Sequence, residues 1–116
     1  MGARFGVQRA GDLSVTLVVT GAVDYQHAPA MIGAFRSAME GGAATATSVD
    51  LARVSFLDSM AVAALLICRR AALDAGRSFR VVNAGGVPAR VLEMAGVRDM
   101  LGLSGGPDAD SVPTGF

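Results

Sequence analysis

Asp58 and Ser59 both have polar side chains that can form hydrogen bonds or be modified. They are adjacent and come immediately before the most apolar segment of the chain. Asp and Ser are among the best helix N-caps, because a side-chain oxygen of either accepts a hydrogen bond from an unpaired N–H of the first turn. Such a bond stabilises a helix by about 1 kcal/mol. The pattern therefore favours a helix that begins here and is capped by one of these two side chains.

The other reactive residue types do not form a catalytic or metal-binding set. His27 is the only histidine, and we expect it near the surface at the start of a helix. Cys68 is the only cysteine, so it has no partner for an internal disulfide, and no base is indicated that would make it a nucleophile. Gly85-Gly86 lacks the lysine and the third glycine of phosphate-binding loops, so it predicts a turn. We expect no enzymatic activity, no metal and no cofactor.

Length and composition indicate a single globular domain. The chain has 116 residues, of which 52% are hydrophobic and 17% are charged. Its formal net charge is zero, which argues against direct nucleic-acid binding, because that function needs a basic surface to neutralise phosphates. The longest apolar run, Met60 to Cys68, is about half of the roughly 20 residues that span a membrane. We therefore expect no membrane insertion and, since no signal peptide is recognisable, a cytoplasmic protein.

Strands and helices are predicted to alternate along the chain. Alternating apolar residues predict a strand over Leu13–Val19, which Gly21 ends, with Phe5–Gln8 as the other strand of a hairpin. The further predicted elements are a helix over Ala28–Met39, a strand over Ser48–Leu51 that continues as an apolar path to Leu57, a helix from Met60 to about Asp74, a strand over Ser78–Asn83 and a short helix over Pro88–Ala95. This order predicts a mixed or parallel sheet with helices packed on it. We expect one domain over residues 1–103 and a flexible tail over residues 104–116.

The helix that starts at Met60 carries no charged residue before Arg69. Its larger apolar side chains can face the sheet: Val62, Leu65, Leu66 and Leu73. Two explanations for the other sides remain open. Either small alanine side chains let neighbouring elements bury the helix all round, or Met60, Ala64 and Ile67 form an exposed apolar patch that docks a partner.

Three stretches of the chain resemble STAS domains of the anti-sigma factor antagonist type. VDLARVSFLDSMAVAALL resembles the family pattern of a strand ending in Asp-Leu, then Phe, any residue, Asp-Ser-Ser-Gly and an apolar helix. VTGAVDYQHAPAM resembles the family's Gly-Glu-Leu-Asp, Ala-Pro and first helix, and VPARVLEMAGVRDML resembles its last helix. The resemblance as a whole covers about residues 8–103. The chain departs from the pattern at Met60, where Ser or Ala is usual, at Ala61, where the family has Gly, and at Ala22, where Glu is usual.

This resemblance implies a STAS-like α/β fold, with a mixed sheet of four to five strands and helices packed mainly on one face. It also implies that an anti-sigma factor serine kinase phosphorylates Ser59, and that the unphosphorylated protein binds this kinase and frees a sigma factor for transcription. A serine phosphatase would reverse the modification. The residues expected to contact the partner are Asp24, Asp58, Met60, Ala61, Ala64 and Ile67.

Two other functions remain open at this point. One is a STAS scaffold in a stress-signalling assembly. The other is a STAS accessory subunit of an ABC-type transport complex, docked on an ATPase and not regulated at Ser59. Asp24 also has a local role available, since it could cap the helix that begins at Ala28, while the resemblance places its loop beside the loop of Ser59.

Overall fold

The computed structural model describes residues 2–40 and 44–103. Its strands are β1 (Arg4–Ala10), β2 (Ser14–Val23), β3 (Ala46–Leu57) and β4 (Ser78–Val82), and its helices are α1 (Ala28–Glu40), α2 (Ser59–Asp74), α3 (Gly86–Met94) and α4 (Arg98–Leu101). The tail predicted for residues 104–116 lies outside the described residues. None of the helices in the described ranges is both long enough and apolar enough to cross a membrane.

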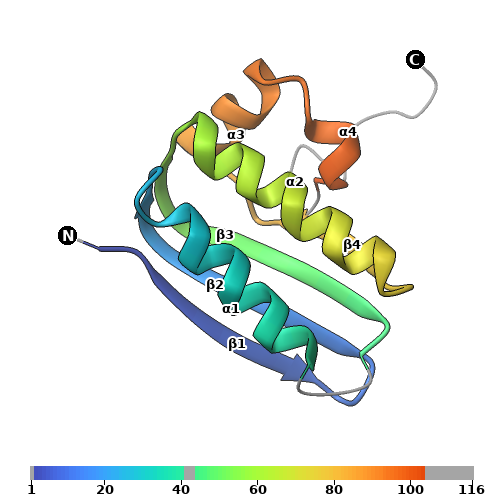
Figure 1. The fold of residues 1–116 in the computed structure, drawn as a ribbon. Helices are drawn as coiled ribbons and strands as arrows, with labels where there is room; N and C mark the ends of the chain where they lie inside the picture. Colours follow the sequence, from blue (N-terminus) through green and yellow to red (C-terminus); the bar gives the residue numbers. More distant parts are fainter. Residues whose placement is uncertain (1, 41–43, 104–116) are drawn as a thin grey trace.

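The strands form one mixed sheet in the order β1-β2-β3-β4. β1 and β2 make an antiparallel hairpin, whereas β2 with β3 and β3 with β4 are parallel pairs. Each parallel pair is joined through a helix, α1 or α2, because a parallel connection has to cross back along the sheet. Both helices lie over the same face (Figure 1). The predicted α/β class, with a mixed sheet and helices mainly on one face, is confirmed.

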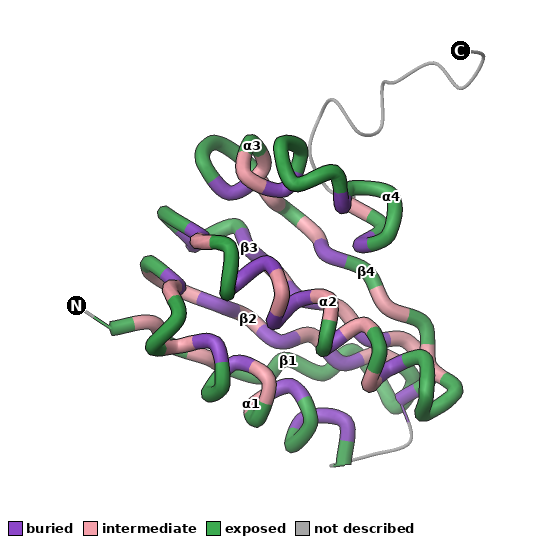
Figure 2. The backbone as a smooth tube through the Cα atoms, turned by 45° about the horizontal axis from the view of Figure 1, so that its top comes forward, coloured by how far each residue is buried: buried purple, intermediate pink, exposed green. Residues whose placement is uncertain are grey.

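This arrangement buries one face of the sheet and leaves the other open. Side chains along β2 alternate between the two faces: Val15, Leu17 and Val19 are buried, while Ser14, Thr16 and Thr20 are half-buried. On the helix side, the rings of Phe35 in α1 and Phe79 in β4 meet edge to face with centroids 5.6 Å apart. Figure 2 shows the buried positions running along the central strands and the inner sides of α1 and α2.

β1, β2 and β3 are all longer than the pattern predicted. Gly21 does not end β2, which continues to Val23, so that prediction is wrong. Gly21 has a φ of 100° and lies at a register shift between β2 and β3, a bulge that bends the strand without ending it. β3 likewise continues to Leu57, which pairs with Val23. The segments that follow β2 and β3 therefore leave the sheet side by side.

Candidate functional site

Asp58 ties the start of α2 to the loop that follows β2. Its Oδ1 accepts a hydrogen bond from the backbone N–H of Ala61, and its Oδ2 accepts one from the backbone N–H of Tyr25, both at 2.8 Å. The backbone N–H of Asp58 donates to the carbonyl of Val23 at 3.2 Å. The predicted proximity of the two loops is confirmed, and one carboxylate holds them together.

Ser59 is the first residue of α2, and its side chain is exposed. The sequence left open which of the two neighbours caps the helix, and the structure assigns the cap to Asp58. The Ser59 hydroxyl makes no hydrogen bond to any residue in the described ranges. A hydroxyl in this position can therefore be modified without the loss of an internal bond, next to first-turn N–H groups that have no partner within the helix.

Asp24 shapes the turn before α1. Its Oδ1 accepts a hydrogen bond from the backbone N–H of Gln26 at 2.9 Å and lies 2.9 Å from Nδ1 of His27. Its carbonyl oxygen accepts from the N–H groups of His27 and Ala28. The carboxylate thus satisfies an N–H of the turn that leads into α1, while the carbonyl accepts the N–H of Ala28 four residues on. This is the arrangement of a helix N-cap, so it supports the predicted capping role of Asp24. The side chain is half-buried, on the same side of the domain as Asp58.

An apolar hollow lies between α1 and α2 and begins next to Ser59. Its volume is about 170 Å³. Residues from the loop before α1, from α1 and from α2 line it: Tyr25, Ala28, Pro29, Ile32, Met60, Ala63, Ala64 and Ile67. The largest of these side chains remain open to solvent, since Tyr25 is 62% exposed, Met60 53% and Ile67 43%. Their sizes and exposure suit contact with an apolar group of another molecule.

Two of the predicted contact residues are buried. Ala61 is fully buried and packs in the main core, so its methyl group cannot touch a partner, and we correct that assignment. Ala64 is 1% exposed and forms part of the floor of the hollow, not its rim. The reason is tertiary packing, since both alanines belong to the main core, where α2 packs against α1, the sheet and α4. Tyr25 and Ile32 were not predicted as part of this surface, although an exposed aromatic residue next to Asp24 was a signal for the first.

The apolar helix α2 is buried in part and exposed in part, and the docking of a partner on the exposed part stays a prediction. Small side chains allow close burial of Ala61, Ala64, Cys68 and Ala72, while Met60 and Ile67 stay exposed. Val62 and Leu65 are buried as predicted, and Leu66 is half-buried. Leu73 is 42% exposed, so the prediction that it faces the sheet is wrong. Ala72, not Leu73, is the buried residue of the last turn, because the side of α2 that carries Ala72 faces the core.

The remaining reactive groups lie apart from the hollow and its rim. Cys68 is fully buried, and burial raises the pKa of its thiol to about 12, with the charge of Arg36 as a smaller, opposing influence. A thiol in this state is a small core residue and a poor nucleophile. Within the described part of the chain, no group of three or more His, Cys, Asp or Glu side chains is placed to hold a metal ion.

A family model described as "Mlab, STAS domain" matches residues 6–103. The chain belongs to the STAS domain family. No curated protein sequence matches this STAS domain significantly. Several solved structures do match it.

This STAS domain shares its fold with proteins described as anti-sigma factor antagonists. One from Mycobacterium paratuberculosis is 23% identical with a TM-score of 0.75, over 92% of this chain and 89% of that one. The antagonist SpoIIAA in its unphosphorylated form is 18% identical with a TM-score of 0.73, over 90% of both chains. A sulfate transporter family protein from Wolinella succinogenes is 15% identical with a TM-score of 0.65, over 81% of this chain and 78% of that one. At these identities the likeness is one of fold.

Proposed function

We propose that this STAS domain is an anti-sigma factor antagonist that binds an anti-sigma factor serine kinase and is released when that kinase phosphorylates Ser59. The observation that supports this most is the separation of roles at the start of α2. Asp58 makes the cap bond, so the exposed Ser59 hydroxyl is available for transfer of a phosphoryl group. SpoIIAA, which shares the fold, has been solved in a phosphorylated as well as an unphosphorylated form.

The domain itself should tolerate a phosphate on Ser59. A phosphoserine carries about −1.5 to −2 charges at pH 7. At the first position of a 16-residue helix, it would lie near unpaired N–H groups and the positive end of the helix dipole. Since helix N-termini favour anions in this way, we expect phosphorylation to leave the fold and its stability nearly unchanged.

A partner seated on the hollow would not tolerate the phosphate equally well. The hollow begins at Met60, the residue after Ser59, and Asp58 already places a carboxylate on the other side. Binding would require a dianion to be desolvated against apolar side chains and near a like charge, which is costly. A loss of about 2.8 kcal/mol in binding free energy weakens a complex roughly 100-fold. Phosphorylation would thus switch binding without refolding the domain.

Phosphoryl transfer to the full chain tests this proposal. We would incubate the protein with candidate anti-sigma factor kinases and ATP, and locate the phosphate by mass spectrometry. Ser59→Ala should abolish the transfer. Ser55→Ala, which removes another exposed serine four residues earlier, should leave it unchanged. The proposal fails if a kinase that binds the domain phosphorylates Ser55 or leaves both serines unmodified.

A STAS accessory subunit of a transport complex is the second candidate. The likeness to a protein described as a sulfate transporter family member favours it. In that case the hollow would contact an ATPase, and Ser59 would have no regulatory role. An affinity pull-down from the native host separates the two, because one candidate predicts capture of a serine kinase and the other predicts capture of a transporter ATPase.

A further inference from the structure

The open face of the sheet carries a pocket that the proposed function does not use. Its volume is about 320 Å³, at the lower end of the range for small-molecule sites. Residues at the beginnings of β2, β3 and β4 line it: Ser14, Ala46, Thr47, Ser48, Ser78, Phe79 and Arg80. Because Ser59 follows the C-terminal end of β3, the pocket lies at the opposite end of the strands from the phosphorylation site.

Some hydroxyl groups around this pocket have O–H hydrogens that form no hydrogen bond within the described part of the chain. Thr16 Oγ1 and Ser48 Oγ lie 2.7 Å apart, so one donates to the other and the second hydroxyl hydrogen remains available. The Ser14 hydroxyl makes no hydrogen bond within the described ranges. Two lining hydroxyls are directed elsewhere: that of Thr47 donates to the Ser78 carbonyl at 2.6 Å, and that of Ser78 donates to the Thr45 carbonyl at 3.4 Å. The pocket therefore offers free O–H donors to a ligand.

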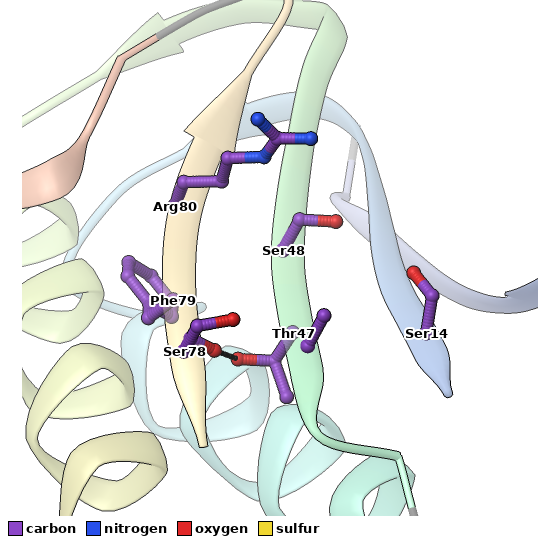
Figure 3. A pocket seen from close by; sticks show the side chains of 7 residues that line it. Ser14, Thr47, Ser48, Ser78, Phe79 and Arg80 are labelled. Carbon is purple, nitrogen blue, oxygen red and sulfur yellow. Dashed lines mark hydrogen bonds between the residues drawn. The ribbon is translucent and has the colours of Figure 1, made fainter. Parts of the chain in front are cut away.

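Arg80 adds a positive charge that no acidic residue neutralises. It is exposed and forms no ion pair with any residue that the structure describes. In the parallel register it stands opposite Ser48, and Figure 3 shows its guanidinium extending toward β3 above that serine. A guanidinium presents several N–H donors in a planar fork that matches a carboxylate or a phosphate.

The base of the Arg80 side chain is held in place from the edge of the sheet. Gly102 packs so closely against β4 that a Cβ on it would lie 3.2 Å from the Cβ of Arg80. Gly102 also has a φ of 59°, in the left-handed region that glycine adopts without strain. The chain after α4 thus supports Arg80 on one side, while the guanidinium stays free on the other.

Asp50 is an acidic residue two positions after Ser48 on β3. It does not line the pocket, and its Oδ1 accepts a hydrogen bond from the backbone N–H of Ala52 at 2.8 Å. Its charge opposes anion binding but is partly satisfied by its own backbone. Among the lining residues, Arg80 carries the only charge, and it is positive.

We propose that this pocket binds a small soluble compound through an oxyanion, a phosphate or carboxylate group. Arg80 pairs with the oxyanion, and the hydroxyls of Ser14 and Ser48 donate hydrogen bonds to it. The ligand is small, because the pocket holds about 320 Å³. The site acts independently of the hollow between α1 and α2, since it lies on the other face of the sheet.

Nuclear magnetic resonance on the full chain tests this site with inorganic phosphate and, separately, acetate as probes at constant ionic strength. We expect saturable shifts of the backbone amides of residues 14, 46–48 and 78–80, with dissociation constants in the millimolar range. Arg80→Gln should weaken binding at least fivefold, whereas Asp50→Asn should strengthen it about twofold. Arg90→Gln, which removes an exposed arginine on α3, should leave the titration unchanged.

Three results would overturn the proposal. One is an unchanged phosphate titration in Arg80→Gln, with a melting temperature that shows the variant to be folded. Another is a set of shifts confined to residues 59–61, which would place the anion at the start of α2. The third is co-sedimentation with vesicles of phosphatidylcholine and phosphatidylglycerol that is lost in Arg80→Gln, which would make the ligand a lipid headgroup instead of a soluble compound.

Discussion

Replacement of Asp58 by alanine removes two hydrogen bonds from the domain at once. One carboxylate oxygen caps α2 at the N–H of Ala61, and the other accepts the N–H of Tyr25, each at 2.8 Å. Loss of a helix cap costs about 1 kcal/mol. The bond to Tyr25 is exposed, so it contributes about 1 kcal/mol, in the ordinary range for a net hydrogen bond. The free energy of unfolding should therefore fall by about 2 kcal/mol.

Thermal denaturation followed by circular dichroism measures this loss. A change of 1 kcal/mol shifts the melting temperature of a domain of about 100 residues by about 5 °C, so Asp58→Ala should melt about 10 °C lower than the parent. Asp58→Ser retains one oxygen for the cap and gives up the bond to Tyr25, so it should lose about half as much. Ser59→Ala is the matched control, and its melting temperature should change by less than about 2 °C, because the hydroxyl has no internal partner.

The division of roles between the two residues is refuted if Ser59→Ala lowers the melting temperature as much as Asp58→Ala does. In that case Ser59 would be the structural cap, and its phosphorylation would disturb the fold. A stable Asp58→Ala variant would equally contradict the reasoning, since it would mean that the two bonds contribute little.

Two further predictions concern α2. Ile67→Ser should weaken partner binding at least tenfold in surface plasmon resonance, because burial of an Ile side chain contributes about 1.5 to 3 kcal/mol. Leu73→Ser is the matched control, since Leu73 is 42% exposed and Ile67 is 43% exposed. Equal losses of affinity in the two variants would exclude the hollow as the contact surface. Cys68 should resist alkylation in the folded protein at pH 8, because a pKa raised from 9.0 to about 12 lowers the thiolate fraction about 1,000-fold. It should react readily in denaturant, and rapid alkylation of the native protein, followed by mass spectrometry, would contradict its burial.

Local patterns were sufficient to predict the kinds and order of the elements as far as α3, but not the short helix α4. Alternation along β2 and the glycines and prolines between segments are local signals. The alternation is a reliable signal because β2 has one face in the core. Gly21 was misjudged because its bulge depends on how β2 pairs with β3, which no local pattern records. The full length of β3 was missed for the same reason.

The candidate site was predicted at its centre and missed at its edges. Asp58 and Ser59 were recognisable because a cap precedes an apolar helix. The sequence could not decide whether Asp58 or Ser59 is the cap, because both residue types cap helices. It also could not show the second bond of the Asp58 carboxylate, which reaches Tyr25, 33 residues away. Ala64 was placed on the surface by counting helix positions, and Ala61 from the family resemblance. Both are buried by tertiary packing, which neither signal records.

The account depends most on a change of affinity at Ser59 without a change of fold. Isothermal titration calorimetry with the cognate serine kinase should compare the unmodified domain with the same domain stoichiometrically phosphorylated on Ser59. We predict at least roughly 100-fold weaker binding of the phosphorylated form, with a melting temperature within a few degrees of the unmodified protein. Equal affinities for the two forms would contradict the account.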